Sequence, residues 1–148
     1  MIAYWLSEYE TAQPEALKAE GLFWDHVAPE NADEYFQKLM AERGYVLKDE
    51  VVLDQDYPDY ATLSDLFSRE HSHEEDEVRY VKDGGGVFDV RTRDDRWIRI
   101  VVGVGDLIIV PAKRNHRFLL SPPQHEHTLI HSVRMFKSDS GWKANVRI

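Results

Sequence analysis

Cysteine is absent from the 148 residues of this chain. Its absence excludes disulfide bonds, catalysis by a thiolate, and the zinc and iron–sulfur sites that depend on cysteine sulfur. Any metal ion that this protein binds must therefore be held by histidine, by carboxylates or by water.

Long apolar runs and clusters of basic residues are also missing. No stretch has the roughly 20 apolar residues of a membrane-spanning helix, and residues 1–10 lack the basic start of a secretion signal. Lysine and arginine number 18 against 27 aspartate and glutamate residues, which gives a formal charge of −9. We therefore expect no membrane insertion, no nucleic-acid partner, and a cytoplasmic location with the nucleus accessible by diffusion.

The length of the chain suits one domain with a single hydrophobic core. We expect residues 1–148 to form that domain, as a monomer. Apolar residues at helical spacing dominate the early part of the chain, whereas short apolar runs separated by glycine dominate the later part. These textures predict a helix-rich part over residues 1–68, a β-barrel core with the functional site over residues 69–136, and a tail over residues 137–148.

Two helices are predicted in the N-terminal part. The segment ENADEYFQKLMAERGY has apolar side chains at helical spacing, Asn31 and Glu34 in the pattern of a capping box, and Gly44 at its exit. A shorter helix is predicted after Pro58. Its apolar side should pack on the barrel and consists of Tyr60, Leu63, Leu66 and Phe67.

The pattern becomes extended from Val78 onward. Short apolar segments are separated by breaks rich in glycine, proline or charge, and these segments are VRYV, VFDVR, RWIRIVV, DLIIV, RFLL and TLIHSVRMF. The three glycines at 84–86 are interpreted as a tight hairpin. Strands of this length and spacing predict a mainly β fold, a small jelly-roll barrel with the helices against its outside.

Four residues form a candidate metal site. His71 and His73 project from the same face of a strand and can reach one ion. Glu77 would lie roughly 13 Å beyond His73 on a straight strand, so the residues between them must turn and bring Glu77 back on the adjacent strand. His116 follows Pro111 and is predicted to begin a strand just beyond a rigid loop.

Three imidazoles and one carboxylate suit Fe(II), Ni(II), Mn(II), Co(II) or Zn(II) and suit magnesium or calcium poorly. An octahedral ion would keep two positions open. The alternative is a set of solvated loop histidines. A second pair, His125 and His127, has no carboxylate at ligand spacing and is interpreted as loop, and His131 is interpreted as a structural strand residue.

The motifs around these residues resemble those of the cupins. The first cupin motif is HxH, three or four residues, Glu, six residues and Gly, and its members here are His71, His73, Glu77 and Gly84. The second cupin motif is Gly, five residues, Pro, one residue, Gly, two residues and His. Its members here are Gly105, Pro111 and His116. Within the cupins, EHSHEEDEVRYVKDGGGVFDVRTRDDRWIRIVVGVGDLIIVPA followed by HRF is similar to the acireductone dioxygenase family.

The resemblance implies a cupin-type jelly roll and one Fe(II) or Ni(II) ion per chain, held by the four ligands. It implies an enzyme that cleaves the acireductone 1,2-dihydroxy-3-keto-5-methylthiopentene with O2 in methionine salvage. The iron form would give formate and 4-methylthio-2-oxobutanoate, and the nickel form would give formate, carbon monoxide and 3-methylthiopropanoate. Two alternatives stay open: a cupin dioxygenase of another enediol or a flavonol, and a non-catalytic metal-binding cupin with a protein partner.

Two further residues are assigned to the substrate. Arg79 has the same parity as Glu77 and is predicted to hold the negative charge of an enediolate, the alternative being an arginine paired with an acidic neighbour. Phe118 shares the face of His116 and is predicted to wall the pocket or to belong to the core. The chain departs from the cupin pattern next to the site, where Lys113 replaces glycine and is followed by Arg114 and Asn115.

Overall fold

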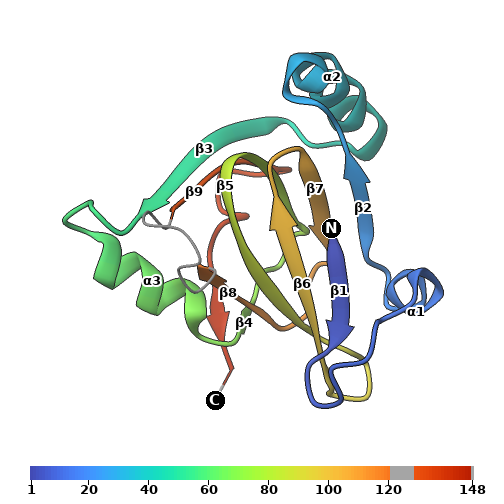
Figure 1. Cartoon of the computed structure of the whole chain (residues 1–148). Helices are drawn as coiled ribbons and strands as arrows, with labels where there is room; N and C mark the ends of the chain where they lie inside the picture. The colour runs from blue at the N-terminus through green and yellow to red at the C-terminus, as the bar shows by residue number, and fades with distance from the viewer. Residues whose placement is uncertain (121–128, 148) are drawn as a thin grey trace.

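One long strand, β5 (Glu77–Arg91), belongs to two antiparallel sheets that face each other. The structure is a computed structural model and describes residues 1–120 and 129–147. Figure 1 shows β5 curving from one sheet into the other. Both sheets therefore enclose a common interior, as in a jelly-roll barrel.

Each half of β5 anchors one sheet. Its second half lies between β6 and β8, in the order β1 (Ile2–Trp5), β6 (Trp97–Gly103), β5, β8 (His116–Leu120), β4 (His71–Ser72) and β10 (Asn145–Val146). Its first half lies between two outer pairs, β7 (Asp106–Val110) with β2 (Phe23–His26), and β9 (Leu129–Phe136) with β3 (Leu47–Asp54). The predicted mainly β fold is confirmed, and the part expected to be helix-rich also supplies β1, β2 and β3.

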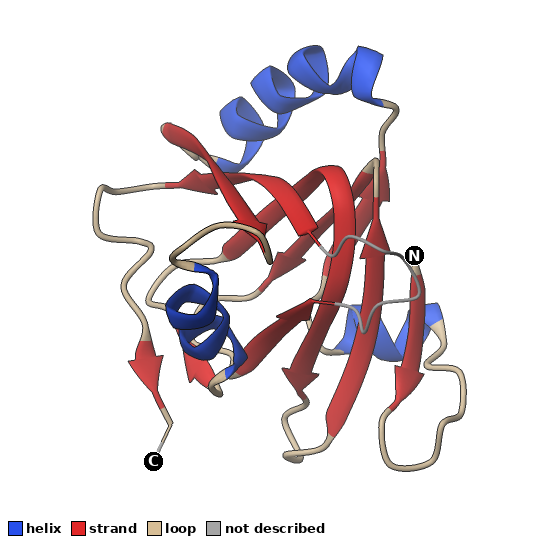
Figure 2. Ribbon diagram, turned by 60° about the vertical axis from the view of Figure 1, so that its left-hand side comes forward, coloured by secondary structure: helices blue, strands red, loops and turns tan. Residues whose placement is uncertain are grey.

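The α-helices of the described residues lie outside the strands, as Figure 2 shows. They are α1 (Pro14–Ala19), α2 (Ala32–Arg43) and α3 (Tyr60–Ser68), and a 3₁₀ turn, η1 (Pro29–Asn31), leads into α2. The predicted exit of α2 is confirmed, because Gly44 has the left-handed φ of 79° typical of a glycine C-cap. The predicted capping box is wrong. Asn31 makes no side-chain cap bond, since the 3₁₀ turn gives it a ψ of 0° instead of the extended backbone of an N-cap.

The hairpin predicted at residues 84–86 is also wrong, because β5 continues through these glycines without reversing direction. Here the strand crosses from one sheet to the other, with a register irregularity between Val81 and Asp83 and a positive φ of 69° at Gly84. A Cβ on Gly84 would lie 2.0 Å from the carbonyl oxygen of Leu129, and one on Gly86 would lie 2.3 Å from the ring of Phe118. The glycines therefore permit a bend and close packing rather than a chain reversal.

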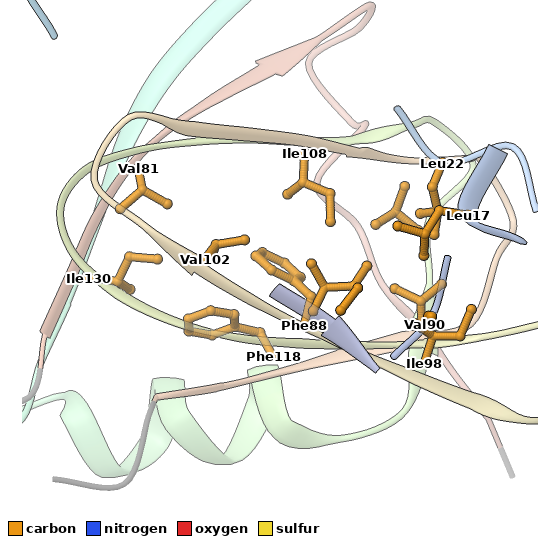
Figure 3. Packing of buried hydrophobic residues seen from close by; sticks show 14 of the residues in the cluster. Leu17, Leu22, Val81, Phe88, Val90, Ile98, Val102, Ile108, Phe118 and Ile130 are labelled. Atoms are coloured by element: carbon orange, nitrogen blue, oxygen red, sulfur yellow. The ribbon is translucent and has the colours of Figure 1, made fainter. Parts of the chain in front are cut away.

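The core fills the space between the two sheets (Figure 3). In β6 the buried side chains alternate with partly exposed ones, as a strand with one covered face requires, and the buried ones are Ile98, Ile100 and Val102. Phe88 and Phe118 meet inside the barrel with ring centroids 4.9 Å apart. A smaller cluster around Phe36 and Tyr80 packs α2 against the outer face of the other sheet.

The described residues include no helix that is both long and apolar enough to cross a membrane.

Candidate metal centre

Three imidazoles meet at one end of the barrel interior. His71 lies on β4 and is directly opposite His116, the first residue of β8, while His73 follows β4. The ring centroids are 4.5 to 5.2 Å apart, and one ring nitrogen from each histidine lies within 4.8 Å of the other two. The two motifs predicted to share an ion are thus brought together by the pairing of β4 with β8.

Backbone carbonyls orient all three rings. The Nδ1 atoms of His71, His73 and His116 lie 2.6, 2.8 and 3.0 Å from the carbonyl oxygens of Arg69, Lys143 and Arg114 respectively. A carbonyl oxygen can only accept, so each Nδ1 carries a proton, and Nε2 is the atom of each ring that could bind a metal. This is the usual arrangement of metal-binding histidines, whose second nitrogen donates to a carbonyl or carboxylate.

The Nε2 atom of His116 is buried without a hydrogen-bond partner, the one such side-chain atom in the described part of the chain. His116 is 2% exposed, and burial lowers its pKa to about 4, so its ring is neutral near pH 7. Leaving a buried polar atom unpaired costs about 1–3 kcal/mol. A metal ion would satisfy this atom, and the donor set therefore fits the metal implied by the motifs.

Glu77 begins β5 beside the histidines, with its Oε2 atom 3.2 Å from Nε2 of His73. Burial alone would raise the pKa of Glu77, but the Arg79 guanidinium and the His73 hydrogen bond outweigh burial and hold that pKa well below its usual range. The carboxylate is therefore ionised. For His73 the same contact outweighs the effect of burial and raises the pKa of the ring.

The predicted return of the chain between His73 and Glu77 is confirmed, but the strand of Glu77 is not adjacent to that of the two histidines. β8 lies between β4 and β5. The first half of β5 belongs to the opposite sheet, so Glu77 faces the histidines across the barrel interior instead of along a shared ladder.

A cavity of about 260 Å³ opens from the four residues. Its other lining residues are Leu66, Phe67, Arg79, Phe88, Phe118, Arg134, Trp142, Ala144 and Val146. Arg79 is buried, and it donates from Nε to Glu77 Oε1 at 2.9 Å and from Nη1 to Ser132 Oγ at 3.0 Å. Phe118 lines the cavity and also packs in the core, so both predicted roles apply to the same ring.

Sequence reasoning missed Arg134 and the C-terminal contribution to the cavity. Arg134 is the cross-strand neighbour of Arg79 and is held by two bonds to Asp49, 2.9 and 2.6 Å long. Alternation along β9 could not identify its inward face, because Val133 packs under α2 while Ser132 faces the interior network, and both are buried. Leu66, predicted to pack on the barrel, is 52% exposed at the cavity.

Among the described residues, the two other histidines, His26 and His131, lie outside this centre. His131 lies 3.5 Å from the carboxylate of Glu50 on the neighbouring strand, away from the three clustered rings. His125 and His127 lie outside the described residues.

The loop before His116 shows how Lys113 replaces the expected glycine. Lys113 has a left-handed φ of 66°, and its N–H donates to the carbonyl of His73 at 2.7 Å. The carboxylate of Asp76 accepts the neighbouring N–H of Ala112 at 3.0 Å and the hydroxyl of Tyr45 at 2.8 Å. The loop therefore keeps the backbone that a glycine would favour, at a cost in strain.

Lys113→Gly is expected to leave stability unchanged or raise it by up to about 1 kcal/mol, because relief of the left-handed strain offsets the added chain entropy of glycine. Denaturant unfolding of the two proteins measures this difference, with Lys137→Gly as a control at an exposed loop residue whose φ is not positive. A clear loss of stability confined to Lys113→Gly would show that the lysine side chain supports the loop.

Comparison with known proteins gives the same family as the motifs of the site. The sequence model of the ARD/ARD' family matches residues 7–144. The chain is 40% identical to the acireductone dioxygenase of Dictyostelium discoideum over 113 residues, which are 76% of this chain and 74% of that one. It is 34% identical to the acireductone dioxygenase of Heterostelium pallidum over 142 residues, which are 96% and 94% of the two chains.

The fold agrees as well. The structure of an acireductone dioxygenase from Bacillus anthracis with a cadmium ion in its active centre superposes with a TM-score of 0.84, covering 98% of both chains at 23% identity. That likeness confirms the cupin-type barrel, and the sequence matches assign the activity class. The chain therefore belongs to the acireductone dioxygenase family and is an enzyme.

Proposed function

We propose that this enzyme cleaves the acireductone 1,2-dihydroxy-3-keto-5-methylthiopentene with O2, as a step of methionine salvage. The observation that carries the proposal is the convergence of three histidine Nε2 atoms and one ionised carboxylate beside a buried arginine, at the floor of a cavity with an apolar mouth. A metal ion at the floor of the cavity would match the enediolate oxygens, and the arginine beside it would match their negative charge. The apolar mouth would match the methylthio tail.

The ion would be held by Nε2 of the three histidines and by the carboxylate of Glu77. Their nitrogen and oxygen donors suit Fe(II) or Ni(II). When bound, such an ion supplies a Lewis acid for the substrate oxygens and an electron path to O2. The cadmium in the related structure supports a metal at this position. All four residues come from one chain, so a monomer suffices for the site.

Arg79 would bind and orient the substrate anion. Its guanidinium has five N–H donors, and the bonds to Glu77 and Ser132 use only Nε and Nη1. The bond to Glu77 fixes the guanidinium against the metal-binding carboxylate, which places the remaining donors in the wall of the cavity. Arg134 adds a second guanidinium on the neighbouring strand, and its pair with Asp49 offsets part of its charge.

The mouth of the cavity suits the apolar tail of the substrate. Leu66, Trp142 and Val146 line it and are each more than half exposed, whereas Phe67 and Phe118 lie deeper. A methylthio chain across this mouth would cover apolar surface and keep water from the reacting enediolate. An aromatic flavonol is a poorer match for a cavity of about 260 Å³.

Oxygen consumption by metal-loaded enzyme, followed for acireductone and for a flavonol, tests the proposal. We expect turnover with acireductone and little with the flavonol. Oxygen uptake only with the flavonol would favour another cupin dioxygenase, and none with either substrate would favour a non-catalytic metal-binding cupin.

Apoprotein reconstituted separately with Fe(II) and Ni(II) is expected to give different products from the same acireductone. The iron form should yield formate and 4-methylthio-2-oxobutanoate. The nickel form should yield formate, carbon monoxide and the shorter acid 3-methylthiopropanoate. The protein ligands are the same in both forms, so the ion must cause any difference. Product analysis by NMR and gas chromatography measures it, and identical products from fully loaded forms would assign the outcome to the pocket.

A further inference from the structure

The last described residues cross the mouth of the cavity. We name residues 142–147 the C-terminal strap. Three of its side chains alternate along the chain and line the cavity, namely Trp142, Ala144 and Val146. The strap is thus part of the pocket wall, although it lies far in sequence from both metal-binding motifs.

The strap also contacts the first metal-binding motif through its backbone. The Nδ1 atom of His73 donates to the carbonyl of Lys143 at 2.8 Å. Asn145 and Val146 pair with Ser72 and His71 as the two-residue edge strand β10. The orientation of the His73 ring therefore depends on the strap staying in place.

Arg147 fastens the end of the strap. Its N–H donates to the carbonyl of Glu70 at 2.9 Å, and its guanidinium donates to the carboxylate of Glu70 at 2.6 Å and to Asp95 at 2.7 and 3.1 Å. Glu70 immediately precedes His71 and is held from the other side by Arg91 at 3.1 Å. Asp95 lies in the turn between β5 and β6. Arg147 therefore ties the strap to two separate points of the barrel.

The other attachments of the strap among the described residues include the pairing of β10, the Lys143 carbonyl and a bond from Asn145 Nδ2 to Glu74 at 3.1 Å. A two-residue edge strand contributes little stability by itself, because so few ladder bonds offset the entropy of ordering the chain. A network of two arginines and two carboxylates is stronger than an isolated exposed pair, although it stays partly solvated and reversible. The Arg147 contacts are thus a main determinant of how firmly the strap is held.

We propose that Arg147 is a positioning residue of this enzyme. By fastening the strap, it keeps the Lys143 carbonyl on His73 and the side chains of Trp142 and Val146 over the substrate tail. The second effect rests on the proposed function, whereas the first concerns the metal site alone. Arg147 itself touches neither the clustered imidazoles nor the cavity.

The test compares Arg147→Ala with Arg93→Ala. Arg93 is a matched control, because it is an exposed arginine that ties α1 to the same turn through Glu20 and has no contact with the strap. Release of Ni(II) from each loaded protein into excess EDTA, and hydrogen exchange of residues 142–147 in the apoprotein, are measured without substrate.

We expect Arg147→Ala to release Ni(II) about three- to tenfold faster than the wild type and to exchange amide hydrogens faster across the strap. Arg93→Ala should match the wild type in both. With acireductone, Arg147→Ala should raise KM more than it lowers kcat, and Arg147→Lys should recover part of each effect, since lysine keeps the charge but not the forked contacts.

Wild-type metal release and strap exchange in Arg147→Ala would overturn the proposal, as would equal changes in Arg93→Ala. If Arg147→Ala does not fold, Asp95→Asn weakens the same contact, and unchanged release and exchange in that variant would also overturn it. Failure of acireductone turnover in the wild type would refute the proposed function and leave the metal-release result intact.

Discussion

His116→Ala is expected to lose most of its bound metal and all measurable turnover. His116 supplies one of four proposed ligands, and its Nε2 atom is the buried side-chain atom that lacks a partner among the described residues. Removing one ligand leaves an open, weakly held ion, and supporting groups alone change metal affinity by about 10–100-fold. Elemental analysis after gel filtration, together with oxygen uptake, measures both losses.

The control variants for this prediction are other histidines of the same chain. His131→Ala removes a strand histidine that pairs with Glu50, and it should keep full metal content. The double variant His125→Ala with His127→Ala should also keep it. Normal metal content and activity in His116→Ala would remove His116 from the site, and metal loss in the double variant would identify the second HxH pair as the binding one.

Arg79→Ala is expected to retain the metal while kcat/KM falls by about 100- to 1000-fold, because the substrate anion loses a positioned charge partner in a water-poor cavity. The fall corresponds to about 3–4 kcal/mol of transition-state binding. Arg79→Lys should recover only part of the activity, since an ammonium cannot reproduce the forked contacts to Glu77 and Ser132.

Stability must be measured beside the kinetics of Arg79→Ala. Arg79 is buried against Glu77, so its loss also leaves an uncompensated carboxylate, which costs about 3–5 kcal/mol when no metal offsets it. Comparing apo and metal-loaded protein by thermal unfolding separates the two effects. If activity falls only in proportion to the folded fraction, Arg79 is a structural ion-pair partner and not a substrate-binding residue.

Local spacing predicted several parts of this molecule well. The helix over Ala32–Arg43, the strand from His116 and the break at Pro111 all follow from patterns within a few residues. Gly105 of the second motif has a φ of 90°, and a Cβ there would lie 2.7 Å from the ring of His26, which explains why that position needs glycine.

Residue spacing along the sequence predicted the structure less well where a residue's role depends on a strand that is distant in the sequence. Glycine is favoured wherever the backbone leaves no room for a Cβ, so the glycines at 84–86 fit a bend as well as a hairpin. Only the packing of Leu129 and Phe118 against β5 decides that the strand bends there without reversing. The parity of His131 and Ser132 could not assign an inward face, since β9 is covered on both sides.

The sequence by itself determined the proposed donor set, because the absence of cysteine and the spacing of His71, His73, Glu77 and His116 depend on residue type and order alone. Only the tertiary structure decided how those donors meet. The pairing of β4 with β8 and the crossing of β5 between sheets bring them together, and the C-terminal strap and Arg134 complete the cavity. These contacts join segments far apart in the chain, and strand partners are chosen by burial and register across the whole barrel, which no local pattern records.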